Sequence, residues 1–136
     1  HDEIGYNNRL PNLNAALGCA QLEQLPVKLI AKRTLFKRYK AAFASVDGVN
    51  LVAEPAQCQS NYWLQTIILN SDHVHHRDTV LQTTNQAGFM TRPVWRLMHQ
   101  LKPFTQCPRM DLSEAEQLSQ RLINIPSSPS LLSIVE

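Results

Sequence analysis

Three neighbouring polar residues, Asn7, Asn8 and Arg9, stand directly before a segment with helical periodicity. Amide and guanidinium groups donate hydrogen bonds, and the positive end of the helix dipole favours negative charge at the same place. The grouping therefore suits the binding of an anion such as a phosphate. Helix capping and loop formation explain the same spacing, and the local sequence leaves both interpretations open.

Other site chemistries have weaker support. His73, His75 and His76 fall in an expected turn, but the pattern offers no further ligand to complete a metal site, so a structural or solvated role is favoured. Cys107 follows His99 by eight residues, which alone does not indicate a thiol nucleophile. The four glycines are isolated, so there is no glycine-rich phosphate loop.

The composition is that of one ordinary globular domain. The chain has 136 residues, of which 43% are hydrophobic and 18% charged. A net charge of +2 is too small to indicate nucleic acid or an anionic membrane as the main partner. The three separated cysteines form no CxxC pair and favour reduced thiols in a cytoplasmic protein. Because the chain opens on His1 and not on methionine, we expect it to be part of a longer protein.

Hydrophobic periodicity predicts the elements that would position these residues. A helix rich in small residues should follow Pro11 and break at Leu25 and Pro26, because the residue before proline is disfavoured in the α region. Asp111 and Glu114 have the spacing of a capping box. Further helices are expected at residues 26–45, 76–87 and 113–122, and strands at 49–52, 61–70 and 89–92. Both faces of the strand at 61–70 are apolar, so it should be central, and Gly88 should be the C′ residue of the helix at 76–87. Pro126 and Pro129 should end regular structure. This order indicates an α+β domain with a mostly antiparallel sheet.

The motifs resemble, in order, those of the DegT/DnrJ/StrS family of sugar aminotransferases. They are GYNNRL followed by AALG and QL, then SNYWLQTIIL, AGFMTRPVWRLMHQLKPF and AEQLSQRLINIPSSPSL. The resemblance covers nearly the whole chain and about the last third of a family enzyme. It implies the small C-terminal domain of a fold-type I aminotransferase, with a short, mostly antiparallel sheet packed with helices. Residues 1–25 would end the large-domain or interface segment with its first helix, and residues 26–136 would form the C-terminal small domain.

The resemblance also implies an activity. Family enzymes use pyridoxal 5'-phosphate to transfer an amino group from glutamate to a keto group on a nucleotide-linked sugar. The sequence around Arg92 and Trp95 is most similar to members that aminate UDP-4-keto-6-deoxy sugars. A cytoplasmic homodimer is implied, without a nucleic-acid or membrane partner. The Schiff-base lysine lies upstream in the family and none of the lysines here matches it, so this chain alone is expected to be inactive.

Individual residues take expected roles by the same resemblance. Asn7 matches an asparagine that reaches across the dimer interface to the cofactor phosphate of the neighbouring subunit, and Arg9 matches the arginine of the same motif. Asn8 occupies a variable position and receives no role. Arg92, Trp95 and His99, in the segment RPVWRLMH, are expected to face the sugar nucleotide or the cofactor. An indole can pack against a sugar or a nucleobase, and an arginine can pair with pyrophosphate oxygens. The alternative is structural, with Trp95 in the core and His99 as a hydrogen-bonded structural histidine.

Two alternatives to an enzyme remain at this stage. A stand-alone α+β module could bind an anionic partner through the basic residues of the second helix, although a solvated face is the simpler interpretation. A dimerisation domain could use the small residues that follow Pro11. Salt-sensitive polyanion binding would favour the first alternative, and a sedimentation measurement would test the second.

Overall fold

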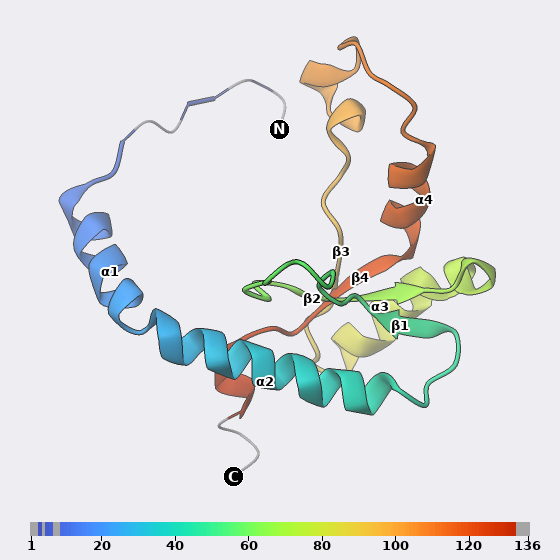
Figure 1. The fold of residues 1–136 in the computed structure, drawn as a ribbon. Coiled ribbons are helices and arrows are strands. Elements are labelled where there is room, and N and C mark those ends of the chain that lie inside the picture. The colour runs from blue at the N-terminus through green and yellow to red at the C-terminus, as the bar shows by residue number, and fades with distance from the viewer. Residues whose placement is uncertain (1–2, 4, 7–8, 133–136) are drawn as a thin grey trace.

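The structure is a computed structural model that describes residues 3, 5–6 and 9–132 (Figure 1). Its helices are α1 (Asn12–Glu23), α2 (Leu25–Phe43), α3 (Arg77–Gln86) and α4 (Ser113–Arg121). Its strands are β1 (Val49–Leu51), β2 (Gln65–Leu69), β3 (Arg92–Pro93) and β4 (Leu122–Ile125). Short 3-10 helices lie at η1 (Ser71–His76), η2 (Met98–Gln100), η3 (Lys102–Phe104) and η4 (Pro129–Leu132). The predicted α+β class with an antiparallel sheet is confirmed.

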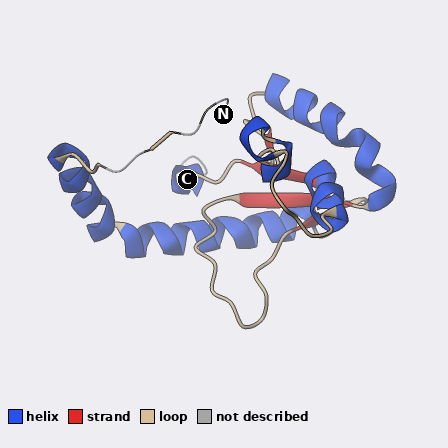
Figure 2. Cartoon of the chain, turned by 90° about the horizontal axis from the view of Figure 1, so that it is seen from above, coloured by secondary structure: helices blue, strands red, loops and turns tan. Residues whose placement is uncertain are grey.

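The four strands form one sheet in the order β1-β2-β4-β3, and every pairing is antiparallel. Ile67 of β2 lies opposite Leu51 of β1 on one side and Ile123 of β4 on the other. The central position expected for β2 from its two apolar faces is therefore correct. Seen from above, the strands are short beside the helices that surround them (Figure 2).

One face of the sheet carries the hydrophobic core. Ile67, Leu69, Ile123 and Ile125 are buried there, because alternate residues of paired strands point to the same side. Helices α2 and α3 cover this face, and partly buried residues of α2, α3 and β1 pack against the cluster: Tyr39, Phe43, Val80, Leu81, Val49 and Leu51. The opposite face carries Thr66 and Ile68 of β2 with Asn124 and Leu122 of β4.

The sequence prediction missed β4. Leu122 continues the helical spacing of α4, so the pattern alone extended that helix to residue 122 and ended regular structure at Pro126. In the structure α4 ends at Arg121 and the chain turns at once into β4. This strand lies between β2 and β3 and contains Ile123, which is fully buried. Pairing with strands distant in sequence, and not local periodicity, creates β4.

The boundaries of two other strands also differ from the prediction. The expected strand at residues 89–92 is replaced by the two-residue β3, because the Phe89 amide donates to the Thr84 carbonyl (2.9 Å) and so belongs to the end of α3. Gly88 has φ +85° and occupies the C′ position, as predicted. The strand expected at 61–70 begins only at Gln65, because residues 61–64 form a loop corner.

The start of α4 differs from a capping box. Asp111 accepts hydrogen bonds from the Ser113 amide (3.1 Å) and the Ser113 hydroxyl (2.8 Å). Leu112 is the N-cap residue and provides no capping side chain. The Asp111 carboxylate therefore fixes the turn before the helix, and Glu114 is exposed in the first turn.

Helix α1 stands apart from the core. It rises from one end of α2, away from the sheet (Figure 1), and none of its residues is buried. The chain breaks between the two helices at Gln24, one residue before the predicted position, and Leu25 is the first residue of α2. Pro26 lies in the first turn of α2, where it removes no helical hydrogen bond. The exposed fractions of Leu13 and Leu17 are 80% and 60%. The apolar face of this helix thus packs against nothing in the described part of the chain.

Several classes of feature are not found among the described residues. No helix there has both the length and the apolar character needed to cross a membrane. No group of three or more histidine, cysteine, aspartate or glutamate side chains is placed to hold a metal ion. Cys19, Cys58 and Cys107 are all free and exposed.

Candidate functional site

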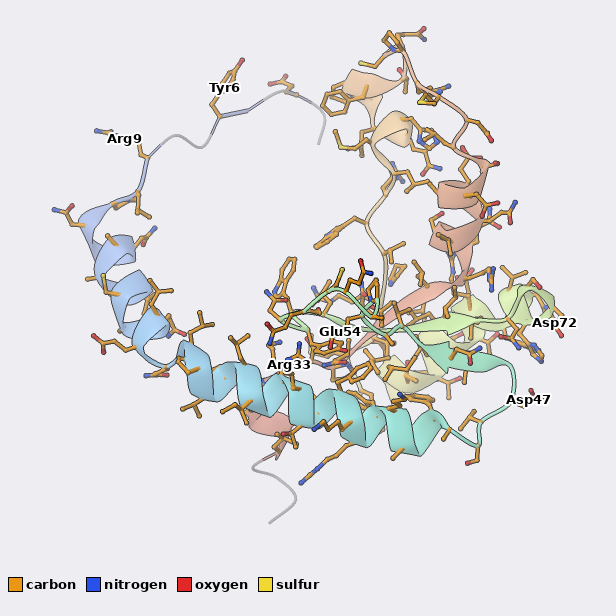
Figure 3. All side chains as sticks on the ribbon, viewed as in Figure 1. Tyr6, Arg9, Arg33, Asp47, Glu54 and Asp72 are labelled. Atoms are coloured by element: carbon orange, nitrogen blue, oxygen red, sulfur yellow. The ribbon has the colours of Figure 1, made fainter. Side chains whose placement is uncertain are left out.

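The expected phosphate-binding motif is described only in part. Asn7 and Asn8 lie outside the described residues. Arg9 is exposed on the segment before α1, and in Figure 3 its side chain points away from the sheet. The N-cap residue of α1 is Pro11, which contributes no side-chain cap. The Arg9 guanidinium is thus presented to the surroundings and not to the sheet of its own chain.

Arg92 lies on the edge strand of the sheet, on the face opposite the core. It belongs to β3 and is opposite Asn124 of β4, which in turn is opposite Thr66 of β2. The Thr66 hydroxyl donates to the Asn124 side-chain oxygen (2.8 Å). Thr66 and Asn124 are partly buried and Arg92 is exposed, so a polar row crosses the sheet and ends in a guanidinium. The sequence analysis did not identify Asn124, because it missed β4.

Trp95 lies three residues beyond Arg92 and contacts the other tryptophan of the chain, Trp63. Their ring centroids are 5.7 Å apart and the ring planes are tilted by 33°. The exposed fractions of Trp95 and Trp63 are 71% and 61%. The core alternative for Trp95 therefore does not hold in this chain. The sequence analysis had included Trp63 in a long strand and missed it as a site residue.

His99 lies on η2 and is largely enclosed. Its side chain is 14% exposed, and its Nε2 lies 2.8 Å from the Glu116 carboxylate of α4. It also lines a hollow of about 300 Å³ together with Cys107 and Leu112. The pair with Glu116 fixes one ring nitrogen, so this contact is the one expected of a structural histidine.

The predicted site residues therefore fall into two places. Arg92, Trp95 and His99 come from one segment that leaves the sheet at β3 and continues into η2 (Figure 1). Each has its contact on a different element: β4, the corner before β2, and α4. Arg9 lies on the separate segment that precedes α1.

The corner before β2 is tied down by Arg33 of α2. Its two terminal nitrogens donate to the two carboxylate oxygens of Glu54, each at 2.9 Å, and one of them also donates to the Ser60 carbonyl (3.1 Å). Hydrogen bonds from Arg33 and from the Ser60 amide hold the pKa of Glu54 below its ordinary value. The prediction that the basic residues of α2 face solvent is thus wrong at Arg33.

Lys32 also points toward this corner and not into solvent. Its ammonium donates to the carbonyl oxygens of Tyr62 (3.3 Å), Trp63 (2.9 Å) and Ser127 (2.8 Å). Partial burial lowers the pKa of Lys32. The lysine therefore joins α2 to the corner before β2 and to the segment after β4.

An open hollow lies beside this junction, between α2 and η4. Its volume is about 500 Å³, within the range of small-molecule sites. Apolar groups of Leu25, Leu29 and Trp63 form much of its lining, with Lys28 and Asn61 as polar members. Trp63 thus lines this hollow and also contacts Trp95.

The chain is similar to known aminotransferases over most of its length. The DegT/DnrJ/EryC1/StrS aminotransferase family matches residues 1–133. EpsN of Bacillus subtilis, which is named as a pyridoxal phosphate-dependent aminotransferase, is 38% identical over 99 residues, covering 73% of this chain and 25% of that protein. GDP-perosamine synthase of Vibrio cholerae is 31% identical over 132 residues, covering 96% of this chain and 36% of that protein.

Solved structures show the same fold. PseC of Helicobacter pylori, an aminotransferase of pseudoaminic acid biosynthesis, superposes with a TM-score of 0.81 at 20% identity, over 95% of this chain and 35% of that one. A DegT DnrJ EryC1 StrS aminotransferase from Brucella abortus gives 0.77 at 22% identity, over 95% and 35%. The chain therefore spans about a third of the length of these relatives.

Proposed function

The chain belongs to the DegT/DnrJ/EryC1/StrS aminotransferase family, and on that premise we propose that it is the C-terminal part of a sugar aminotransferase. The whole enzyme would transfer an amino group from glutamate to a nucleotide-linked keto sugar of the UDP-4-keto-6-deoxy type. Residues 1–25 would end the large-domain or interface segment, and residues 26–136 would form the small domain. The observation that carries this proposal is the exposed Arg92 and Trp95 at the open edge of the sheet.

Pyridoxal phosphate is the cofactor of this family, and the described residues fit only its phosphate end. When bound, the cofactor supplies an electron sink for the transfer of the amino group. Arg9 is exposed and can donate to a phosphate, together with Asn7 outside the described residues. Lys32 donates to three carbonyl oxygens, so it is unsuited to hold the cofactor covalently. By the family resemblance the Schiff-base lysine lies upstream and none of the lysines here matches it, so the chain alone should be inactive.

The residues near β3 would bind the substrate. The exposed guanidinium of Arg92 can pair with the pyrophosphate, while Asn124 beside it offers an amide donor, because its side-chain oxygen already accepts from Thr66. Trp95 offers an exposed indole to a ring of the ligand. His99, held by Glu116, would face the sugar nucleotide through its remaining ring nitrogen.

The whole enzyme would act as a cytoplasmic homodimer. The outward direction of Arg9 suits a residue that serves a neighbouring subunit (Figure 3). The exposed leucines of α1 offer apolar surface for contact with the rest of the enzyme or with the second subunit.

The decisive experiment uses the full-length protein. An absorbance scan should show bound pyridoxal phosphate, and UDP-linked 4-keto-6-deoxy sugars with glutamate should yield the amino sugar. An Arg92→Gln variant should keep the cofactor absorbance and raise the KM for the nucleotide sugar. Absence of both absorbance and turnover in the unmodified enzyme would refute the proposal.

A second candidate substrate is a GDP-linked keto sugar. Three relatives named GDP-perosamine synthase are 29% to 33% identical to this chain and are matched over 94% to 96% of it. The same assay with UDP-linked and GDP-linked 4-keto sugars in parallel distinguishes the two candidates. The linkage with the higher kcat/KM identifies the substrate.

A further inference from the structure

The backbone at Tyr62 adopts a conformation that residues with a side chain rarely take. Its φ is +47°, and it is the one non-glycine residue with positive φ in the described part of the chain. Such a conformation is strained and persists only where the surroundings enforce it. An enforced corner of this kind is a reason to ask what it positions.

The Tyr62 side chain is held from two directions. Its ring stacks on Phe36 of α2 with centroids 4.2 Å apart and planes 18° from parallel. The Arg33 guanidinium lies 5.4 Å from the ring centroid, and Glu54 holds that guanidinium in place. The residue itself is 6% exposed. Figure 3 shows Arg33 and Glu54 pointing toward one another between α2 and the loop before β2.

The backbone on either side of Trp63 is equally fixed. The Trp63 amide donates to the Asn61 side chain (2.9 Å), and its carbonyl accepts from Lys32 (2.9 Å) and from the Ser127 hydroxyl (3.0 Å). Every backbone polar group of Trp63 therefore has a partner, yet its indole is 61% exposed. A rigid backbone therefore holds this large aromatic side chain at the surface of the described chain.

The exposed side chain of Trp63 borders two features that suit a ligand. The first is Trp95, from the segment after β3, with the ring centroids 5.7 Å apart. The second is the hollow of about 500 Å³ that Trp63 lines with Lys28 and Asn61. The pair presents aromatic surface to the molecule's surroundings from two elements distant in sequence.

We propose that Trp63 is a second substrate-positioning residue, and that it forms with Trp95 the surface on which the nucleobase of the nucleotide sugar stacks. The inference rests on the proposed function. A base is flat and stacks on indole, a contact whose loss on alanine substitution is commonly worth a five-fold to hundred-fold change in affinity. Arg92, three residues before Trp95, then lies on the segment that can meet the phosphates.

Binding of nucleoside diphosphate to the full-length protein tests this without turnover. UDP and GDP are titrated by calorimetry, and the tighter of the two is followed in the variants, with inorganic pyrophosphate as the ligand that lacks a base. Trp63→Leu should weaken nucleoside diphosphate binding at least five-fold and leave pyrophosphate binding unchanged. Trp63→Phe, which keeps an aromatic ring, should weaken nucleoside diphosphate binding by less than half as much. Phe89→Leu is the matched control, because Phe89 has the same exposed fraction of 61%.

Kinetics supply the second readout. Trp63→Leu should raise the KM for the nucleotide sugar at least five-fold, with the KM for glutamate and the cofactor absorbance unchanged. If the leucine variant has a lowered melting temperature, Trp63→Gln replaces it with the same expectation. Equal nucleoside diphosphate binding in the Trp63 and Phe89 variants, or an equal loss of pyrophosphate binding, would overturn the inference. Failure of the proposed function is a separate result, since it appears as absent absorbance and turnover in the unmodified enzyme.

Discussion

Single side chains of α2 determine how the corner before β2 responds to pH. Arg33 and the Ser60 amide donate to Glu54 and lower its pKa, so the folded state binds fewer protons at this carboxyl than the unfolded state does. The stabilisation is therefore complete above the ordinary value of 4.5 and is lost as the pH falls through the lower folded value. The pKa values of Asp72 and Asp111 are also lowered, by hydrogen bonds from the side chains of His73 and Ser113 respectively.

Glu54→Gln should consequently reduce the acid sensitivity of the chain. We expect the loss of unfolding free energy between pH 7 and pH 3 to be smaller in this variant than in the unmodified chain. Urea denaturation at a series of pH values measures it. Glu114→Gln removes an exposed carboxyl in the first turn of α4 and serves as the control. Identical pH slopes for the two variants would show that the Arg33 contact contributes nothing in solution.

Gly48 gives a second residue-scale prediction. It has φ +76°, and a Cβ there would lie 3.0 Å from the His73 ring. Gly48→Ala should cost the conformational penalty of about 1–2 kcal/mol plus the displacement of that ring. Gly88→Ala is the control, because Gly88 has φ +85° with nothing within 4 Å of the added Cβ. Thermal and urea unfolding should therefore rank Gly48→Ala as the more destabilised, and the reverse order would contradict the contact with His73.

At the scale of elements, β4 links the core to the candidate site. Its residues alternate, with Ile123 and Ile125 in the core and Asn124 on the face that carries Thr66 and Arg92. A strand of four residues therefore both closes the hydrophobic cluster and sets the position of β3. The segment that contains Trp95 leaves the sheet directly after β3.

Ile123→Ala should test this role. Because Ile123 is fully buried between β2 and β3, the substitution should lower the unfolding free energy by about 2–5 kcal/mol. Ile30→Ala is the matched control, since Ile30 is 68% exposed on α2 and should cost much less. Urea denaturation of both variants measures the difference. Similar free energies would mean that β4 is not part of the cooperative core.

At the scale of the whole molecule, the chain presents surfaces that its own fold does not use. Helix α1 contributes no buried residue, although the spacing of Leu13 and Leu17 is that of a helix with one packed face. Within the proposed enzyme this face would contact the large domain or the second subunit. The outward Arg9 lies just before it (Figure 3).

The double change Leu13→Gln, Leu17→Gln should separate stability from assembly. The melting temperature of the 136-residue chain should stay unchanged, because both side chains are exposed in it. In the full-length protein we expect weaker dimerisation by sedimentation, since each leucine can contribute about 1.5–3 kcal/mol on burial. Met110→Gln, at a residue 89% exposed, is the control. Unchanged sedimentation would show that α1 contributes to dimerisation neither directly nor indirectly.

The sequence by itself determined the family, the α+β class and the helices, because these depend on motifs and local periodicity. It predicted the centre of β2 and the C-terminal glycine of α3 for the same reason. Tertiary structure alone decided β4 and the Tyr62 corner, because strand pairing and a strained backbone are enforced by residues distant in sequence. It also decided that Lys32 and Arg33 face inward and that Trp63 meets Trp95. No spacing rule joins residues on separate elements, so the tryptophan pair became visible only in the folded chain.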